Sequence, residues 1–156
     1  MPKLPALDPN TIDVRIGATY PAEFAASTAK RAKRALTSAL GLTQFGVNIT
    51  ELPPGAASAL KHWHSHEDEF VYVLSGEAVL VTDDDEQVLG PGMCAGFPAG
   101  IEKGHFFVNR SAAAATILEV GSRDDRDEGN YPDDDLHCKP GRYQNPQFTR
   151  KDGTPV

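Results

Sequence analysis

The chain has 156 residues, with 15 Lys or Arg against 22 Asp or Glu, so its formal net charge is −7. A chain of this length is expected to form one domain and can bury about 70% of its unfolded surface without disulfide bonds. The acidic balance argues against a nucleic-acid partner, which requires clustered basic side chains.

No apolar run approaches the ~20 residues of a membrane span, and residues 1–10 lack the apolar segment of a signal peptide. The two cysteines, Cys94 and Cys138, are too few for a disulfide framework. We therefore expect a cytoplasmic protein without a membrane partner.

The first 40 residues divide into an arm and an ambiguous segment. Residues 1–21 contain four prolines and are expected to be extended. Residues 22–40 are rich in Ala, Lys and Arg, which favours a helix, although an edge strand over residues 31–36 also fits. The basic run at residues 30–34 is interpreted as a solvated face or an edge strand, in preference to a binding patch.

Short strand-like segments separated by turn residues follow from residue 41 onward. The turn signals include Pro-Pro-Gly at 53–55, Ser-Gly at 75–76 and Gly-Pro-Gly at 90–92. Such a series predicts an all-β sandwich or barrel. The expected strands cover residues 45–52, 59–64, 69–74, 77–82, 87–89, 94–97, 105–109 and 116–120.

The last 35 residues are polar, with an acidic run at residues 133–135. We expect this tail to wrap the β domain with little regular structure. The predicted organisation is an N-terminal arm with a short helix or edge strand at 1–40, a β barrel at 41–121 and a C-terminal tail at 122–156.

The segment from His62 to Glu69 holds three histidines and three acidic residues in eight positions. Neutral imidazole and carboxylate are common ligands of transition metals. Because strand side chains alternate faces, His62 and His64 share one face and Trp63 takes the other. A hairpin after His64 would return Glu69 to the two histidines, while Glu67 and Asp68 would be turn residues.

A further ligand is expected from elsewhere in the chain, and His105 is the candidate because it begins a strand-like segment. Three histidines and one glutamate would hold one divalent ion, such as Mn, Fe, Zn or Ni, and leave coordination positions open to substrate. Lys103 has the same strand parity as His105, so its ammonium group is a candidate for binding a substrate carboxylate or phosphate.

The chain resembles the cupin superfamily in both of that family's motifs. The first, G-x5-H-x-H-x3,4-E-x6-G, runs from Gly55 to Gly76, and the second, G-x5-P-x-G-x2-H-x3-N, runs from Gly92 to Asn109. Six residues instead of five separate Gly55 from His62, and four instead of two separate Gly100 from His105. Both departures fall in turns, where extra residues are tolerated.

The resemblance implies a double-stranded β-helix, a jelly-roll-type barrel, with His62, His64, Glu69 and His105 as the metal ligands inside it. His66 matches no ligand of the family. The sequences of residues 62–70 and 131–136 are similar to those of a subgroup of small bacterial cupins, some of which are described as sugar-phosphate isomerases.

Three functions are compatible with this resemblance. The first is a metal-dependent isomerase, lyase or epimerase acting on a small oxygenated molecule, a sugar phosphate being one candidate. Glu69 or His66 would move the proton in that reaction. The second is a non-haem iron dioxygenase, because iron accepts the same ligands. The third is a cupin that binds or senses a small molecule without turnover.

The segment that begins at Glu69 is apolar on both faces. Val71 and Val73 share the face of Glu69, whereas Phe70 and Tyr72 take the opposite, outer face. Exposed apolar patches mark interfaces. We therefore expect a homodimer with Phe70, Tyr72 and Trp63 near the covered face, the alternative being that the N-terminal arm covers this face within one chain.

Overall fold

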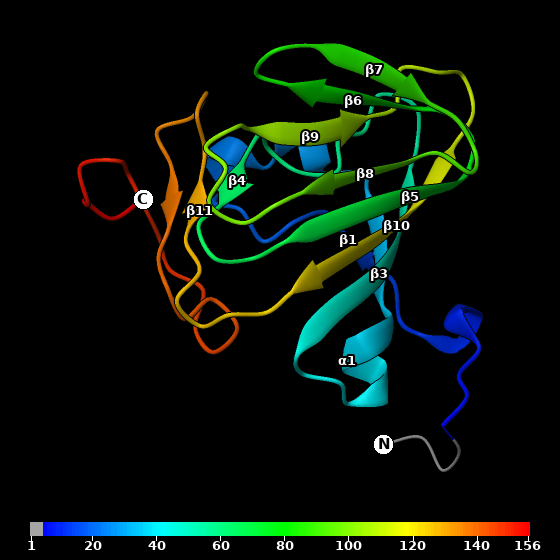
Figure 1. Cartoon of the computed structure of the whole chain (residues 1–156), viewed down its shortest axis with the longest axis horizontal. Helices are drawn as coiled ribbons and strands as arrows, with labels where there is room; N and C mark the ends of the chain where they lie inside the picture. The colour runs from blue at the N-terminus through cyan, green and yellow to red at the C-terminus, as the bar shows by residue number, and fades with distance from the viewer. Residues whose placement is uncertain (1–4) are drawn as a thin grey trace.

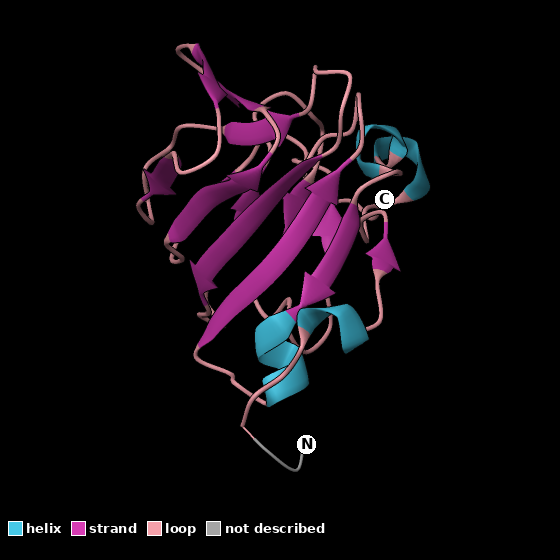
Figure 2. Ribbon diagram, turned by 90° about the vertical axis from the view of Figure 1, so that its right-hand side faces the viewer, coloured by secondary structure: helices cyan, strands magenta, loops and turns pink. Residues whose placement is uncertain are grey.

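A computed structural model of the chain describes residues 5–156 and consists mainly of antiparallel β-sheets (Figure 1). The largest sheet has six strands, seen in Figure 2 as the broad curved layer. The order of its strands is β1 (Arg15–Ile16), β2 (Ala32–Ala35), β3 (Phe45–Leu52), β10 (Ala115–Ser122), β5 (Glu69–Ser75) and β8 (Cys94–Phe97).

The long-range pairing of β3 and β5 with β10 organises this sheet. Glu69 lies opposite Gly121, and Val71 lies opposite Glu119, which in turn lies opposite Asn48. Because side chains alternate along each strand, these residues all face the interior. Strand β5 ends in a turn at Gly76, whose φ of 73° favours glycine.

A three-stranded sheet covers one part of the inner face. Its order is β7 (Glu86–Leu89), β6 (Ala78–Thr82) and β9 (His105–Val108). The hydrophobic core lies between the two sheets, where Phe107 packs in one cluster with Val73 and Ile117. Burying a side chain of this size contributes about 1.5–3 kcal/mol. The predicted all-β fold class is confirmed.

Residues 22–40, for which a short helix or an edge strand was expected, contain both helical turns and a strand. They contain two 3-10 helices, η2 (Ala22–Phe24) and η3 (Ala26–Thr28), then β2 and a single α-helix, α1 (Leu36–Leu40). A further 3-10 helix, η1 (Pro9–Thr11), lies in the arm. Strand β2 pairs with β3 on one side and β1 on the other, so it is not an edge strand. Backbone pairing with the sheet has overridden local helix propensity.

The basic run at residues 30–34, expected to be a solvated face or an edge strand, is only partly solvated. Arg31 is buried, and Lys33 has only 12% of its side chain exposed, because both point toward the interior of the sheet. Lys30 is exposed, as expected for a solvated lysine.

The C-terminal tail wraps the sheets. It has more regular structure than expected, because three of its strands form a third sheet with β4. The third sheet has the order β13 (Phe148–Thr149), β12 (His137–Cys138), β11 (Gly129–Asn130) and β4 (Trp63–His64). The orange and red part of the chain in Figure 1 thereby lies beside the histidine segment. The expected strand over 59–64 is reduced to β4.

Cys94 and Cys138 are both free thiols. Within residues 5–156, no helix has the length and apolar character needed to cross a membrane.

Candidate metal centre

The four residues predicted as metal ligands come together from three parts of the fold. His62 lies just before β4 and exchanges backbone hydrogen bonds with His105, the first residue of β9, at 3.2 and 2.9 Å. Glu69 begins β5, which pairs with β8 and β10 and not with β4. The expected hairpin between β4 and β5 is therefore wrong, and Glu69 approaches the histidines from the facing sheet.

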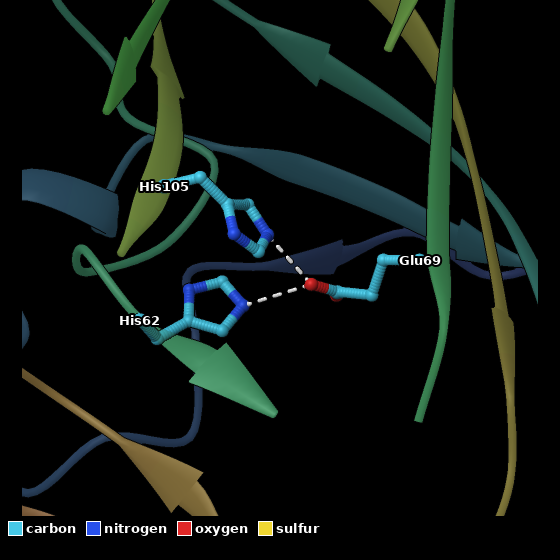
Figure 3. A group of neighbouring side chains, drawn as sticks. All are labelled: His62, Glu69 and His105. Carbon is cyan, nitrogen blue, oxygen red and sulfur yellow. Dashed lines mark hydrogen bonds and ion pairs between the residues drawn. The ribbon is translucent and has the colours of Figure 1, made fainter. Parts of the chain in front are cut away.

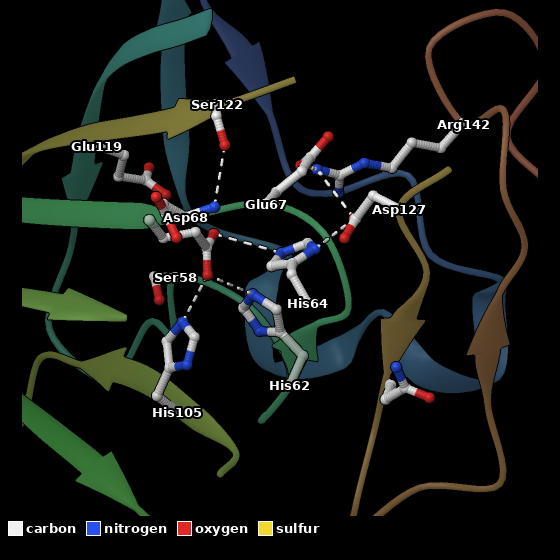
Figure 4. Close-up of polar contacts among 12 residues, drawn as sticks. Ser58, His62, His64, Glu67, Asp68, His105, Glu119, Ser122, Asp127 and Arg142 are labelled. Carbon is white, nitrogen blue, oxygen red and sulfur yellow. Dashed lines mark hydrogen bonds and ion pairs between the residues drawn. The ribbon is translucent and has the colours of Figure 1, made fainter. Parts of the chain in front are cut away.

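The three imidazoles direct their Nε2 atoms at the carboxylate of Glu69. Nε2 of His105 lies 2.6 Å from Oε2, Nε2 of His62 lies 3.4 Å from Oε2, and Nε2 of His64 lies 3.4 Å from Oε1. Figure 3 shows the first two contacts with Glu69, and Figure 4 shows how the three histidines lie relative to one another. Sequence positions up to 43 residues apart thus place three nitrogen donors and one carboxylate around one point.

The opposite ring nitrogens show how two of these imidazoles are held. Nδ1 of His62 lies 2.7 Å from the carbonyl oxygen of Leu60, and Nδ1 of His64 lies 2.6 Å from Oδ2 of Asp127. An acceptor at Nδ1 keeps the proton there and leaves the Nε2 lone pair free for a metal. His105 is held differently, since its ring stacks on Phe97 with centroids 3.6 Å apart.

The electrostatics favour an ionised carboxylate at this point. Burial alone raises the pKa of Glu69, but the charge of His62 and hydrogen bonds from the three imidazoles outweigh burial and hold the pKa well below its usual range. Burial lowers the pKa of His105, which favours the neutral ring that a metal requires. Burial lowers the pKa of His64, but its hydrogen bonds with Asp127 and Glu69 outweigh burial and raise the pKa to about 9, so metal binding there must release a proton. The donor set of three imidazoles and one carboxylate fits a divalent transition metal.

A second group of buried charges lies behind His64 and was missed by the sequence analysis. Glu67 is not a solvated turn residue: it is buried, forms an ion pair with Arg142 and accepts a hydrogen bond from Tyr143 at 2.6 Å. Asp127 is fully buried and accepts the backbone N–H of His66 at 2.9 Å. Figure 4 shows Arg142 reaching both carboxylates.

Donor atoms of His64, Glu67 and Asp127 also lie close enough together to bind an ion. The guanidinium of Arg142 already supplies positive charge there, 3.7 Å from Asp127. We therefore assign this group to orienting His64. Nothing in the sequence marked Arg142, because it is an isolated basic residue in a polar tail.

Two predicted site residues do not contact the cluster. His66 is exposed, and its Nδ1 lies 2.8 Å from the hydroxyl of Ser65. Lys103 precedes β9 instead of belonging to it, and its ammonium lies 2.7 Å from Asp84 with 56% of the side chain exposed. The strand parity that pointed Lys103 inward does not apply, because the strand begins at His105.

Two cavities flank the cluster. The larger, called the sheet cavity, measures about 430 Å³ and lies on the inner face of the six-stranded sheet. The smaller, called the loop pocket, measures about 260 Å³. His64, Glu67 and Glu69 line both of them. The sheet cavity has Arg15, Arg31, Lys33, Asn48 and Glu119 in its wall, whereas the loop pocket has Trp63, Phe97, Pro98, Ile101 and Lys103.

Comparison with known proteins agrees with this architecture. Residues 48–121 match the family model described as the cupin domain. A crystal structure of a sugar phosphate isomerase of the cupin superfamily from Silicibacter pomeroyi is 47% identical, with 97% of this chain and 96% of that chain covered and a TM-score of 0.92. The chain belongs to the cupin superfamily.

More distant similarities show how widely this fold is used. A provisionally named sugar phosphate isomerase from Acidithiobacillus ferrooxidans is 29% identical over 82% of this chain and 81% of that chain, with a TM-score of 0.72. The polyketide cyclase RemF from Streptomyces resistomycificus is 25% identical over 75% and 78%, with a TM-score of 0.61. No curated protein matches the chain.

Proposed function

We propose that this cupin binds one divalent transition metal and catalyses an isomerase- or epimerase-type reaction on a small oxygenated molecule, with a sugar phosphate as the preferred candidate. The observation that carries the proposal is the convergence of three imidazole Nε2 atoms on Glu69 at the wall of a cavity of about 430 Å³. That volume lies within the range of about 300–1,000 Å³ that is typical of small-molecule sites.

His62, His64, His105 and Glu69 would hold the metal, which when bound polarises a substrate carbonyl or hydroxyl. The three imidazoles are buried, which would limit the access of water to the cluster. We assign proton transfer to Glu69 because its carboxylate is ionised and lines the cavity, although its lowered pKa makes it a weak base. His66, the other base that the sequence suggested, is exposed and lines neither cavity.

Polar groups in the sheet cavity favour turnover over simple binding. A wall made only of apolar groups would suit a binding or sensing protein, but Lys33 and Glu119 face this cavity. The similarity to a structure named sugar phosphate isomerase supports the same reaction class. A non-haem iron dioxygenase remains the alternative, because iron accepts the same ligands.

Metal analysis of the purified protein by mass spectrometry tests the proposal first. We expect about one divalent ion per chain, and we expect His62→Ala and His105→Ala to lose most of it. His66→Ala is the control from the same segment and should keep the wild-type content, because its ring lies outside the cluster. Wild-type metal content in both ligand variants would refute the site.

The reaction class is tested on the loaded protein. Interconversion of ketose and aldose phosphates, followed by NMR, is the expected result with manganese or zinc bound. Bound iron with substrate-dependent oxygen uptake would instead establish the dioxygenase.

We also propose that the protein is a homodimer through the outer face of the six-stranded sheet. Phe70, Tyr72 and Leu74 on β5 are 41%, 37% and 43% exposed, so the described part of the arm does not cover them. The strand register places Leu118 beside Tyr72, which extends the apolar face across β10. Light scattering should give twice the chain mass, and Tyr72→Lys should shift it toward the monomer. A wild-type monomer would refute the dimer.

A further inference from the structure

Side chains alternate between the two faces of the sheet along β2, so part of the basic run at residues 30–34 lines the sheet cavity. Lys33 lies opposite Thr50 of β3, a fully buried residue, and therefore points to the interior of the sheet. Arg31 lies two residues earlier, just before β2, and is also buried. Both side chains line the sheet cavity, whose wall also contains His62, His64 and Glu69.

Arg31 is a buried cation without an acidic partner in the part of the chain that is described. Its Nε donates to the carbonyl oxygen of Gly17 at 3.3 Å and its Nη1 donates to the carbonyl oxygen of Ser58. No carboxylate among residues 5–156 lies within ion-pair distance of it. A buried charge is costly unless it is paired, so this arrangement favours an anionic ligand.

Lys33 has one acidic neighbour, which is itself shared. Nζ of Lys33 lies 3.4 Å from Oε1 of Glu119, and the hydroxyl of Thr50 donates to the same oxygen. Burial lowers the pKa of Lys33, and Glu119 acts in the opposite direction by stabilising the ammonium. Because only one carboxylate oxygen lies near it, the Lys33 ammonium has hydrogens left for a further acceptor.

The charge of the whole cavity wall has the sign opposite to that of the chain. Five basic residues (Arg15, Arg31, Lys33, Arg123 and Arg142) and three acidic residues (Glu67, Glu69 and Glu119) line it, a surplus of two positive charges. The chain as a whole carries −7. A positive cavity in an acidic protein concentrates small anions and repels cations other than a bound metal.

We propose that Arg31 and Lys33 form an anion subsite that holds the phosphate or carboxylate group of the substrate in the sheet cavity. The proposal rests on the proposed function for the identity of the substrate, but its test does not depend on turnover. Guanidinium and ammonium groups are the usual partners of such oxygens. The anion would occupy the β2 side of the cavity, with the rest of the substrate directed toward Glu69 and the histidines.

Titration of the purified, metal-loaded protein with inorganic phosphate by calorimetry tests the subsite. We expect Lys33→Gln and Arg31→Gln to weaken phosphate binding about ten- to hundredfold, as expected for losing a hydrogen bond to a charged group. Lys30→Gln removes the same charge from the same run outside the cavity and should change the affinity less than about twofold. Thermal melting of each variant verifies that it is folded.

A purely structural role for these residues predicts a different result. Glu119→Gln removes the carboxylate that competes for Lys33, so it should tighten phosphate binding, which a role in stabilising the arm would not produce. A parallel titration with acetate distinguishes the two sources of the anion: stronger binding of phosphate assigns a phosphorylated substrate, and stronger binding of acetate assigns a carboxylated one.

Three outcomes would overturn the subsite. They are no binding of either anion by the wild-type protein, unchanged binding by a folded Lys33→Gln variant, and loss of phosphate binding in His62→Ala with full binding in Lys33→Gln. The last would place the anion on the metal. Binding at Arg31 and Lys33 without any isomerisation would refute the proposed function while leaving the subsite intact.

Discussion

The sheet cavity and the loop pocket share Glu69 and His64 but differ in how they are built. The sheet cavity is formed by paired strands and the C-terminal tail, and its wall is rich in buried charge. The loop pocket is formed by turns around β8 and β9, and its wall is largely aromatic and aliphatic. One cluster of metal-binding groups therefore faces a polar space on one side and an apolar space on the other.

Lys33 and Lys103, one in each cavity wall, show how the local backbone determines whether a charged side chain faces a cavity or solvent. Lys33 is held in a strand with 12% of its side chain exposed, whereas Lys103 lies in a turn with 56% exposed. The ammonium of Lys103 pairs with Asp84 at the surface. A strand fixes the direction of a side chain, whereas a turn lets a lysine reach solvent, so only the sheet cavity presents a fixed cation.

Among substitutions in the wall of the sheet cavity, we expect the largest loss of unfolding free energy from replacing Arg142. Arg142→Met would leave Glu67 buried without its cation, while Asp127 would keep its contact with His64. Breaking a buried pair costs about 3–5 kcal/mol, and the 28% exposure of Arg142 suggests roughly 3 kcal/mol, the lower end. Chemical denaturation of the metal-free protein measures this loss of unfolding free energy.

Arg126→Met is the control for that measurement. Arg126 forms its ion pair with Asp124 at the surface, with 75% of its side chain exposed. Solvent screens such pairs, so its removal should leave the unfolding free energy nearly unchanged. Equal losses in the two variants would show that the buried charges behind His64 do not stabilise the cavity wall.

The central sheets could be predicted from the sequence because their signals are local. Alternating apolar residues and glycine turns mark β3, β5, β6 and β10 within their own segments. Strand β2 could be predicted only as one of two alternatives, an edge strand over residues 31–36 or a helix. Its composition favours a helix, and only pairing with β3, more than ten residues away, makes it a strand.

The candidate ligands could be named for a similar reason, since the motif spacing holds His62, His64 and Glu69 within eight residues. The residues around them could not. Asp127 contacts His64 from 63 positions away, and Glu119 meets Lys33 across three strands. Such partners follow from strand register and tail packing, neither of which leaves a periodic trace in the sequence.

We expect the smallest effect from replacing Lys103, which lines the loop pocket. This substitution tests whether the loop pocket contributes to phosphate binding. Lys103→Gln should change phosphate affinity less than about twofold, because the ammonium is already paired with Asp84 and largely in solvent, where a single charge is screened. The calorimetric titration used for Lys33→Gln measures it directly. If Lys103→Gln weakened phosphate binding as much as Lys33→Gln does, the anion would contact both sides of the cluster. The two cavities would then act as one substrate site that continues past Glu69.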